Sequence, residues 1–112
     1  MISKATGRFI RMSPQKARLV VDLIRGKGVN EALMVLKFTN KRATREIEKV
    51  VKSAVANATQ KSENIDVDDL FIEQCFINEG PRLKRIRPAP MGRAYRYQRR
   101  TAHITVALGE RE

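Results

Sequence analysis

Arginine supplies most of the chemistry that this sequence could perform, and it is concentrated in one segment. Residues 81–109 hold eight basic residues, seven of them arginine, and no acidic residue. A guanidinium group can bind phosphate through two parallel N–H groups and can stack on a nucleobase. Tyr95 and Tyr97 lie among these arginines and offer further stacking surfaces. The segment therefore predicts a surface for a polyanion, most simply a nucleic acid.

Other reactive residues are few and scattered. His103 is the only histidine, and since the sequence places no nucleophile beside it, we expect it to make a local hydrogen bond or to meet RNA. Cys75 and His103 could approach each other on adjacent strands, but a structural zinc site usually needs four ligands. Residues 66–69 lack the glycine and distal glutamate of a calcium loop, and residues 26–28 are too short for a phosphate-cradling loop. We predict no catalytic residue, metal site or cofactor.

The composition of the whole chain narrows its class. The chain has 112 residues and a formal net charge of +11, which predict one domain, spanning residues 1–112, with an anionic partner. Residues 1–27 carry seven basic residues against one acidic, whereas residues 28–69 carry seven of each. The positive charge therefore lies towards the two ends of the chain. A single cysteine favours a reducing compartment, and the apolar runs are too short to predict a secretory signal or a membrane partner.

Two of three predicted helices lie in the first third of the chain. The first begins at Ser13, whose side chain we expect to cap it, and ends at Gly26. The second is short and opens near residue 28. Asn30 is its expected cap, and Val29 and Met34 have the spacing of a hydrophobic staple.

The third helix, from about residue 40 to residue 60, has the clearest pattern. Its apolar stripe consists of Ala43, Ile47, Val50, Val51, Ala54 and Ala58. A neighbouring basic stripe consists of Arg42, Arg45, Lys49 and Lys52. We interpret the basic stripe as a solvated face rather than an RNA-facing one, with Glu48 and Lys52 forming an intrahelical pair.

Three strands complete the predicted fold. Residues 2–11 indicate a basic edge strand, and residues 70–78 follow a polar, acidic loop at 61–69 and supply apolar side chains to both faces. Residues 101–108 alternate regularly, which places three apolar residues on one face and His103 on the other. The fold class is therefore α+β, with three helices packed on one side of a small antiparallel three-stranded sheet.

Residues 80–100 lie between two strands that should pair, so we predict that these strands continue outward as a long basic β-hairpin. Pro88, Pro90 and Gly92 mark its tip, and each arm would have about ten residues, or roughly 33 Å. Such a hairpin has few apolar side chains and many like charges, so it is marginal until phosphate neutralises it. The alternative is a disordered basic loop.

Eight short stretches along the chain carry a recognisable family pattern, at residues 13–20, 23–27, 39–43, 53–58, 78–81, 83–85, 92–94 and 100–106. Through them the sequence closely resembles the bacterial large-subunit ribosomal protein twenty-two family over essentially its whole length. The resemblance implies a cytoplasmic, non-enzymatic protein on the outer face of the large subunit, near the mouth of the peptide exit tunnel. It also implies a hairpin threaded through large-subunit ribosomal RNA, with neighbouring large-subunit proteins and the nascent peptide as further partners.

The hairpin tip departs from the family pattern of Pro-Arg-Ala, a basic residue, then Gly-Arg-Ala. The tunnel-lining residues expected here are Pro88, Ala89, Pro90, Met91, Gly92, Arg93 and Ala94. The first arginine and the basic residue before glycine are missing, but Arg93 matches, so we expect Arg93 to contact the tunnel wall.

The predicted RNA-binding residues come from both basic ends of the chain. They are Lys4, Arg8, Arg11, Lys16, Arg18, Arg25, Lys27, Arg82, Lys84, Arg85, Arg87, Arg93, Arg96, Arg99, Arg100 and His103. An alternative reading is an architectural protein that bends duplex DNA with a proline-tipped basic arm. A third, a small nuclease, is disfavoured because residues 81–109 contain no acid.

Overall fold

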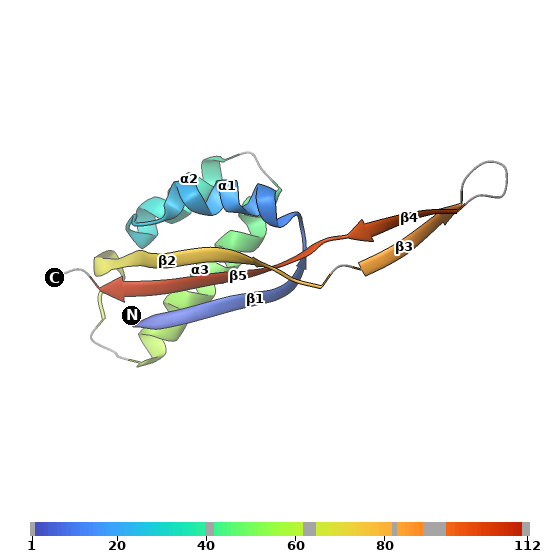
Figure 1. Cartoon of the computed structure of the whole chain (residues 1–112). Coiled ribbons are helices and arrows are strands. Elements are labelled where there is room, and N and C mark those ends of the chain that lie inside the picture. Colours follow the sequence, from blue (N-terminus) through green and yellow to red (C-terminus); the bar gives the residue numbers. More distant parts are fainter. Residues whose placement is uncertain (1, 40–41, 62–64, 82, 89–93, 111–112) are drawn as a thin grey trace.

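The computed structural model describes residues 2–39, 42–61, 65–81, 83–88 and 94–110, with the backbone alone described for 83–88 and 94–99 (Figure 1). The helices and strands follow in the order β1 (Ser3–Arg11), α1 (Pro14–Ile24), α2 (Val29–Phe38), α3 (Ala43–Lys61), a short 3-10 turn (Val67–Asp69), β2 (Leu70–Glu79), β3 (Leu83–Pro88), β4 (Ala94–Arg99) and β5 (Thr101–Glu110). The strands predicted at 2–11, 70–78 and 101–108 are all present.

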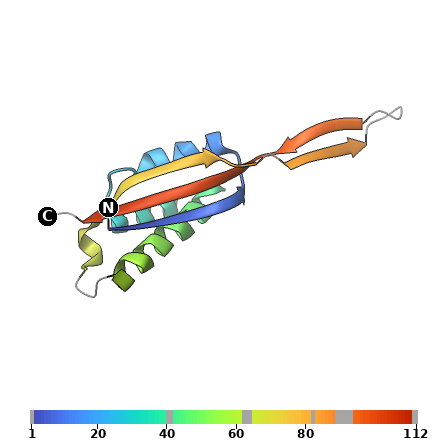
Figure 2. The same ribbon diagram turned by 60° about the horizontal axis from the view of Figure 1, so that its bottom comes forward.

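One antiparallel sheet and three helices form the body of the protein. The sheet has the order β1-β5-β2, so the regularly alternating strand β5 is central and the basic strand β1 is at an edge. All three helices lie on the same face of this sheet, and no helix of the described residues covers the opposite face (Figure 2). The predicted α+β class is therefore confirmed.

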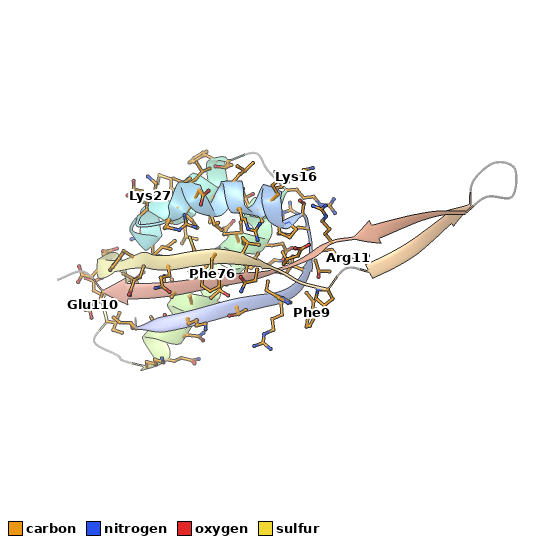
Figure 3. The ribbon with its side chains drawn as sticks, in the orientation of Figure 1. Phe9, Arg11, Lys16, Lys27, Phe76 and Glu110 are labelled. Atoms are coloured by element: carbon orange, nitrogen blue, oxygen red, sulfur yellow. The ribbon has the colours of Figure 1, made fainter. Side chains whose placement is uncertain are left out.

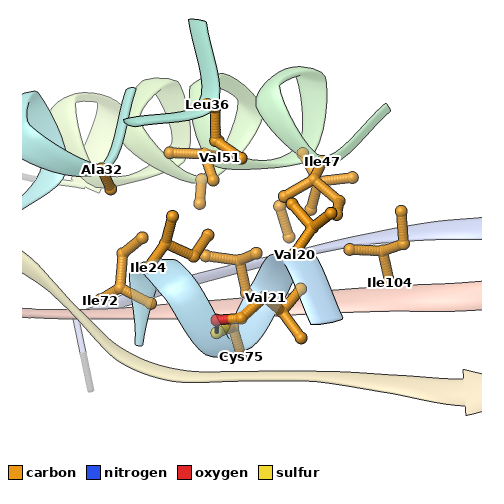
Figure 4. Packing of buried hydrophobic residues seen from close by; sticks show 14 of the residues in the cluster. Val20, Val21, Ile24, Ala32, Leu36, Ile47, Val51, Ile72, Cys75 and Ile104 are labelled. Atoms are coloured by element: carbon orange, nitrogen blue, oxygen red, sulfur yellow. Dashed lines mark hydrogen bonds between the residues drawn. The ribbon is translucent and has the colours of Figure 1, made fainter. Parts of the chain in front are cut away.

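The hydrophobic core lies between the helices and the covered face of the sheet. Its α3 members are the six residues of the predicted apolar stripe, all buried. Val51 of α3 faces the other helices and lies beside Leu36 of α2 (Figure 4). Ile104, Val106 and Leu108 supply the β5 side of the core and are fully buried. Burial of this amphipathic stripe, rather than intrinsic helix propensity, is what stabilises α3.

A bulge in β2 accounts for the irregular alternation of apolar residues in its sequence. Leu70 and Ile72 are buried, and so are Cys75 and Ile77, which are out of phase with the first pair. A register shift between Ile72 and Gln74 inserts one extra residue into β2 opposite β5. Such a bulge returns the later apolar side chains to the core face. The strand thus has one buried face throughout.

The predicted helix ends are confirmed in part. Ser13 is the N-cap of α1 as predicted, but its side chain makes no capping hydrogen bond. Gly28, not Asn30, is the N-cap of α2, and the Asn30 side chain instead donates a hydrogen bond to Asp68 Oδ1 at 2.6 Å. Met34 is exposed, so the staple with Val29 does not form. Gly26, with φ of +82°, does end α1 as predicted.

Beyond the sheet, β3 and β4 pair as a separate antiparallel hairpin that projects from the end of the body away from both termini (Figure 1). The molecule is therefore elongated, at 65 × 26 × 15 Å. Each hairpin strand has six residues rather than the predicted ten, and Pro88 pairs with Ala94 inside the ladder instead of belonging to the turn. The rest of the predicted tip, residues 89–93, lies outside the described residues.

The hairpin joins the body through a short, hydrogen-bonded base. The Gly80 N–H donates to the Thr101 carbonyl at 2.9 Å, and the Thr101 hydroxyl donates to the Pro81 carbonyl at 2.5 Å. These bonds cross the gap between the two sheets, where the β2 and β5 ladder ends and the β3 and β4 ladder begins. They fix the point from which the hairpin leaves.

Cys75 belongs to the core and does not approach His103. Cys75 pairs with Val106 on the covered face, whereas His103 pairs with Asn78 and lies on the open face. The Cys75 thiol is buried and donates to the Val21 carbonyl at 3.4 Å. Burial raises the pKa of this thiol, and the nearby Arg25 partly offsets that rise.

We therefore expect Cys75 to resist alkylation while the protein is folded. A raised pKa leaves less thiolate at a given pH, and the thiolate is the reactive form. Iodoacetamide at pH 8 should react at least about tenfold more slowly with native protein than with protein in concentrated urea. Equal rates in the two conditions would contradict the buried position of Cys75.

Candidate nucleic-acid interface

Two of the predicted RNA-binding arginines are engaged in holding the fold together. Arg18 donates through Nε and Nη2 to the Ile77 carbonyl, at 3.3 and 3.2 Å. Arg25 donates to the Cys75 carbonyl at 2.9 Å and pairs with Asp22 at 2.7 Å, and this bond to Asp22 raises the pKa of Arg25. Both guanidinium groups fasten α1 to β2. Their capacity for phosphate is correspondingly reduced.

Lys27 is also separated from the main basic surface. It pairs with Glu31 at 3.4 Å and lies at the end of α1 far from the hairpin (Figure 3). A surface pair of this kind contributes little to stability. Its main consequence here is that a carboxylate already neutralises Lys27.

A basic groove lies at the other end of α1, next to the hairpin base. It has a volume of about 550 Å³ and is lined by Arg11, Met12, Ser13, Lys16, Leu19, Arg42 and Ala43. Arg11 and Lys16 are both near the point where the hairpin leaves the body (Figure 3). The side chains of Arg11, Lys16 and Arg42 are exposed and make no ion pair with any other residue that the structure describes. The groove thus presents three cations that no described carboxylate pairs with, next to the apolar side chains of Met12, Leu19 and Ala43.

Arg42 was not among the predicted RNA-binding residues. The sequence pattern placed it with Arg45, Lys49 and Lys52 on a solvated face, and the structure supports that interpretation for Lys49 and Lys52. Lys52 pairs with Glu48 at 3.0 Å and Lys49 with Glu46 at 3.7 Å. Arg42 differs because it precedes α3 and meets the end of β1 across the groove. Only tertiary structure brings it beside Arg11.

His103 fills the local role that was predicted for it. Its Nδ1 accepts a hydrogen bond from the Phe9 backbone N–H at 3.1 Å, and its ring meets the Phe9 ring edge-on at 5.0 Å between centroids. Arg8, beside this pair, and Lys4, further along β1, are both exposed. Arg100 is exposed between β4 and β5. The sequence did not identify Phe9 as a candidate residue.

The hairpin carries the remaining predicted cations. Lys84, Arg85 and Arg87 lie on β3, and Arg96 and Arg99 lie on β4. The register places Arg85 opposite Tyr97 and Arg87 opposite Tyr95. Arg82 and Arg93 lie outside the described residues.

Within the described ranges, no group of three or more histidine, cysteine or acidic residues could hold a metal ion. Over the same ranges, no helix combines the length and apolar character that a membrane crossing requires.

Comparison of the sequence with known proteins identifies its family. Residues 5–109 match the family model described as ribosomal protein L22p/L17e. The chain belongs to the L22p/L17e family of ribosomal proteins. A relative from Solibacter usitatus (strain Ellin6076), named large ribosomal subunit protein uL22, is 62% identical over 109 residues, which cover 97% of this chain and 96% of the relative. The motif-based prediction of the family is thus confirmed, and the L22p/L17e match includes most of β1, all three helices and both strands of the hairpin.

Proposed function

We propose that this L22p/L17e protein binds large-subunit ribosomal RNA, supports folding of that RNA during assembly and lines the peptide exit tunnel with its hairpin tip. The protein is a structural constituent of the large ribosomal subunit, in the cytoplasm, as its family indicates. Ribosomal RNA and other large-subunit proteins are therefore its partners. The nascent peptide would be met at the tip, and no catalytic step is assigned to the chain.

The observation that carries the proposal is the distribution of uncompensated positive charge. Arg11, Lys16 and Arg42 surround a groove beside the hairpin base, and β3 and β4, whose sequences are rich in arginine, extend from there as an antiparallel ribbon. Lys27, Lys49 and Lys52, by contrast, pair with glutamates. A groove of exposed cations at the base of an arginine-rich hairpin matches the charge of an RNA backbone.

The chemistry of the contact follows from RNA itself. Packed A-form helices hide their major-groove edges, so recognition should depend mainly on phosphates, 2′-hydroxyls and shape. Each guanidinium that binds a phosphate displaces condensed counterions and lowers repulsion between neighbouring RNA segments. A narrow two-stranded ribbon could then lie between such segments and hold them together. The body would remain at the surface and anchor the ribbon through the hydrogen bonds of Gly80 and Thr101.

Sedimentation combined with a DNA-bending assay tests this function. Affinity-tagged protein expressed in its host should sediment with the large subunit and should be recovered with ribosomal RNA after washing in moderate salt. The purified protein should leave the curvature of a duplex DNA fragment unchanged. Recovery away from the large subunit, together with strong bending of the duplex, would establish the architectural DNA-binding alternative instead.

A further inference from the structure

Phe9 occupies an unusual position on β1. The register of β1 with β5 shifts between Gly7 and Ile10, so Arg8 and Phe9 both lie opposite His103 in a bulge. Phe9 has φ of +57°, and it is the only described non-glycine residue with a positive φ. Bulky side chains rarely adopt this left-handed conformation. The backbone is therefore strained at this residue.

The strained backbone at Phe9 does not bury the Phe9 ring. The Phe9 side chain is 63% exposed, and it touches the body through the edge-on contact with His103. The backbone N–H of Phe9 donates to His103 Nδ1, which holds the bulge in place. The fold thus maintains a costly conformation that presents an aromatic ring to solvent. Departures from local preference of this kind are typical of functional sites.

The surroundings of Phe9 suit a nucleic acid better than a protein. Arg8 is next to Phe9 in the bulge. Arg11 lies two residues after Phe9, where β1 pairs with Thr101, the first residue of β5. Arg100, exposed, immediately precedes that residue. Phe9 and Arg11 both lie at the hairpin end of the body, where the ribbon begins (Figure 3). An aromatic face among cations matches a base with its flanking phosphates.

We propose that Phe9 is a stacking platform for an unpaired base of ribosomal RNA, held at the entry to the hairpin. The base lies on the exposed ring, and Arg8 binds a neighbouring phosphate. His103 is a positioning residue, because its contact with the Phe9 N–H fixes the bulge. This inference rests on the proposed RNA-binding function and assigns one of its contacts.

Four single variants test the platform. Phe9→Asn removes the ring but tolerates the left-handed backbone, so the fold should persist. Phe9→Trp keeps a stacking surface. Phe38→Ala is the matched control, since Phe38 is 78% exposed on α2 with an ordinary backbone. Arg8→Gln removes one proposed phosphate contact. Each is measured for thermal stability and for affinity to protein-free large-subunit ribosomal RNA over a range of salt concentrations.

The expected pattern separates stacking from charge. Phe9→Asn should bind the RNA about 5- to 150-fold more weakly, with an unchanged slope against log salt and an unchanged melting temperature. Phe9→Trp and Phe38→Ala should bind like the unmodified protein. Arg8→Gln should flatten the slope by about 0.7–0.9.

Three results would overturn the inference. The first is an RNA affinity of Phe9→Asn equal to that of the wild type. If that variant bound RNA normally but failed to enter subunits, the ring would be assigned to a contact with another protein. The second is an equal loss in Phe38→Ala. The third is a loss in Phe9→Asn that comes with a flattened slope. If the unmodified protein showed no salt-dependent RNA binding, the proposed function itself would fail, and the platform with it.

Discussion

Changing Arg85, Arg87, Arg96 and Arg99 together to glutamine should weaken binding to large-subunit ribosomal RNA by about 10²–10³-fold at 0.1 M salt. Each arginine lost from the hairpin removes a phosphate contact and the counterion release that accompanies it. The slope of log affinity against log salt should therefore flatten by up to about 0.7–0.9 per contact removed. The melting temperature should stay unchanged, because the core cluster is built from residues of the body.

A second variant with the same change in charge provides the control. Lys37, Arg45, Lys49 and Lys52 are exposed on α2 and α3, and two of them pair with glutamates. Changing these four to glutamine should lower RNA affinity far less, since none of them lines the groove or belongs to the hairpin. Equal losses in the two variants would show that net charge alone drives binding and would refute a directed basic ribbon.

Deleting residues 90–92 from the hairpin tip should have a different effect. The deleted residues carry no charge, so RNA affinity should barely change and subunits should still form. The bore of the tunnel should change, measured as altered sensitivity to small ligands or nascent peptides that lodge there. If this deletion abolished RNA binding while the four-arginine variant bound normally, specific recognition by the tip would replace the electrostatic account.

Val51→Asp should lower the free energy of unfolding by at least about 3 kcal/mol. Val51 is fully buried at the centre of the α3 stripe, where no basic residue belongs to the surrounding core cluster. The total stability of such a chain is about 5–15 kcal/mol, so much of it would be lost. Urea denaturation followed by far-ultraviolet circular dichroism measures the change.

Ser53→Asp is the control for that substitution. Ser53 lies two residues further along α3, and it is exposed. The same new charge should there change the free energy of unfolding by no more than about 0.5 kcal/mol. If Val51→Asp also unfolded at the wild-type urea concentration, α3 would have to present a different face to the hydrophobic core.

Periodic patterns were sufficient to predict much of this fold. The apolar stripe of α3 and the alternation of β5 each follow a single period within one element. Both could therefore be predicted from the local sequence. Side-chain capping hydrogen bonds could not be predicted in this way, because alternative partners compete for the same side chain. Asn30 is a residue type that often caps helices, yet its side-chain amide donates instead to the carboxylate of Asp68, 38 residues away. The bulge in β2 was visible only as a broken alternation at Ile72 and Gln74.

The candidate interface was predicted in part. Clustering of arginine in residues 81–109 indicated the proposed nucleic-acid surface, since charged residues can be counted without knowledge of the fold. The sequence could not show that Arg18 and Arg25 would bind carbonyls of β2, or that Arg42 would join Arg11 across a groove. Phe9 was missed because a left-handed residue in an edge strand leaves no periodic signal. The nearest hint was an aromatic residue within a basic strand.

Site-specific cross-linking from the hairpin in intact ribosomes tests the central claim most directly. A photoreactive amino acid is placed at Arg85, Arg93 or, as a control on α2, Lys37, and the cross-linked nucleotides are mapped. The account predicts that positions 85 and 93 link to large-subunit ribosomal RNA, that position 93 also links to nascent peptide, and that position 37 links to RNA far less. Cross-links from positions 85 and 93 that reach no ribosomal RNA would contradict it.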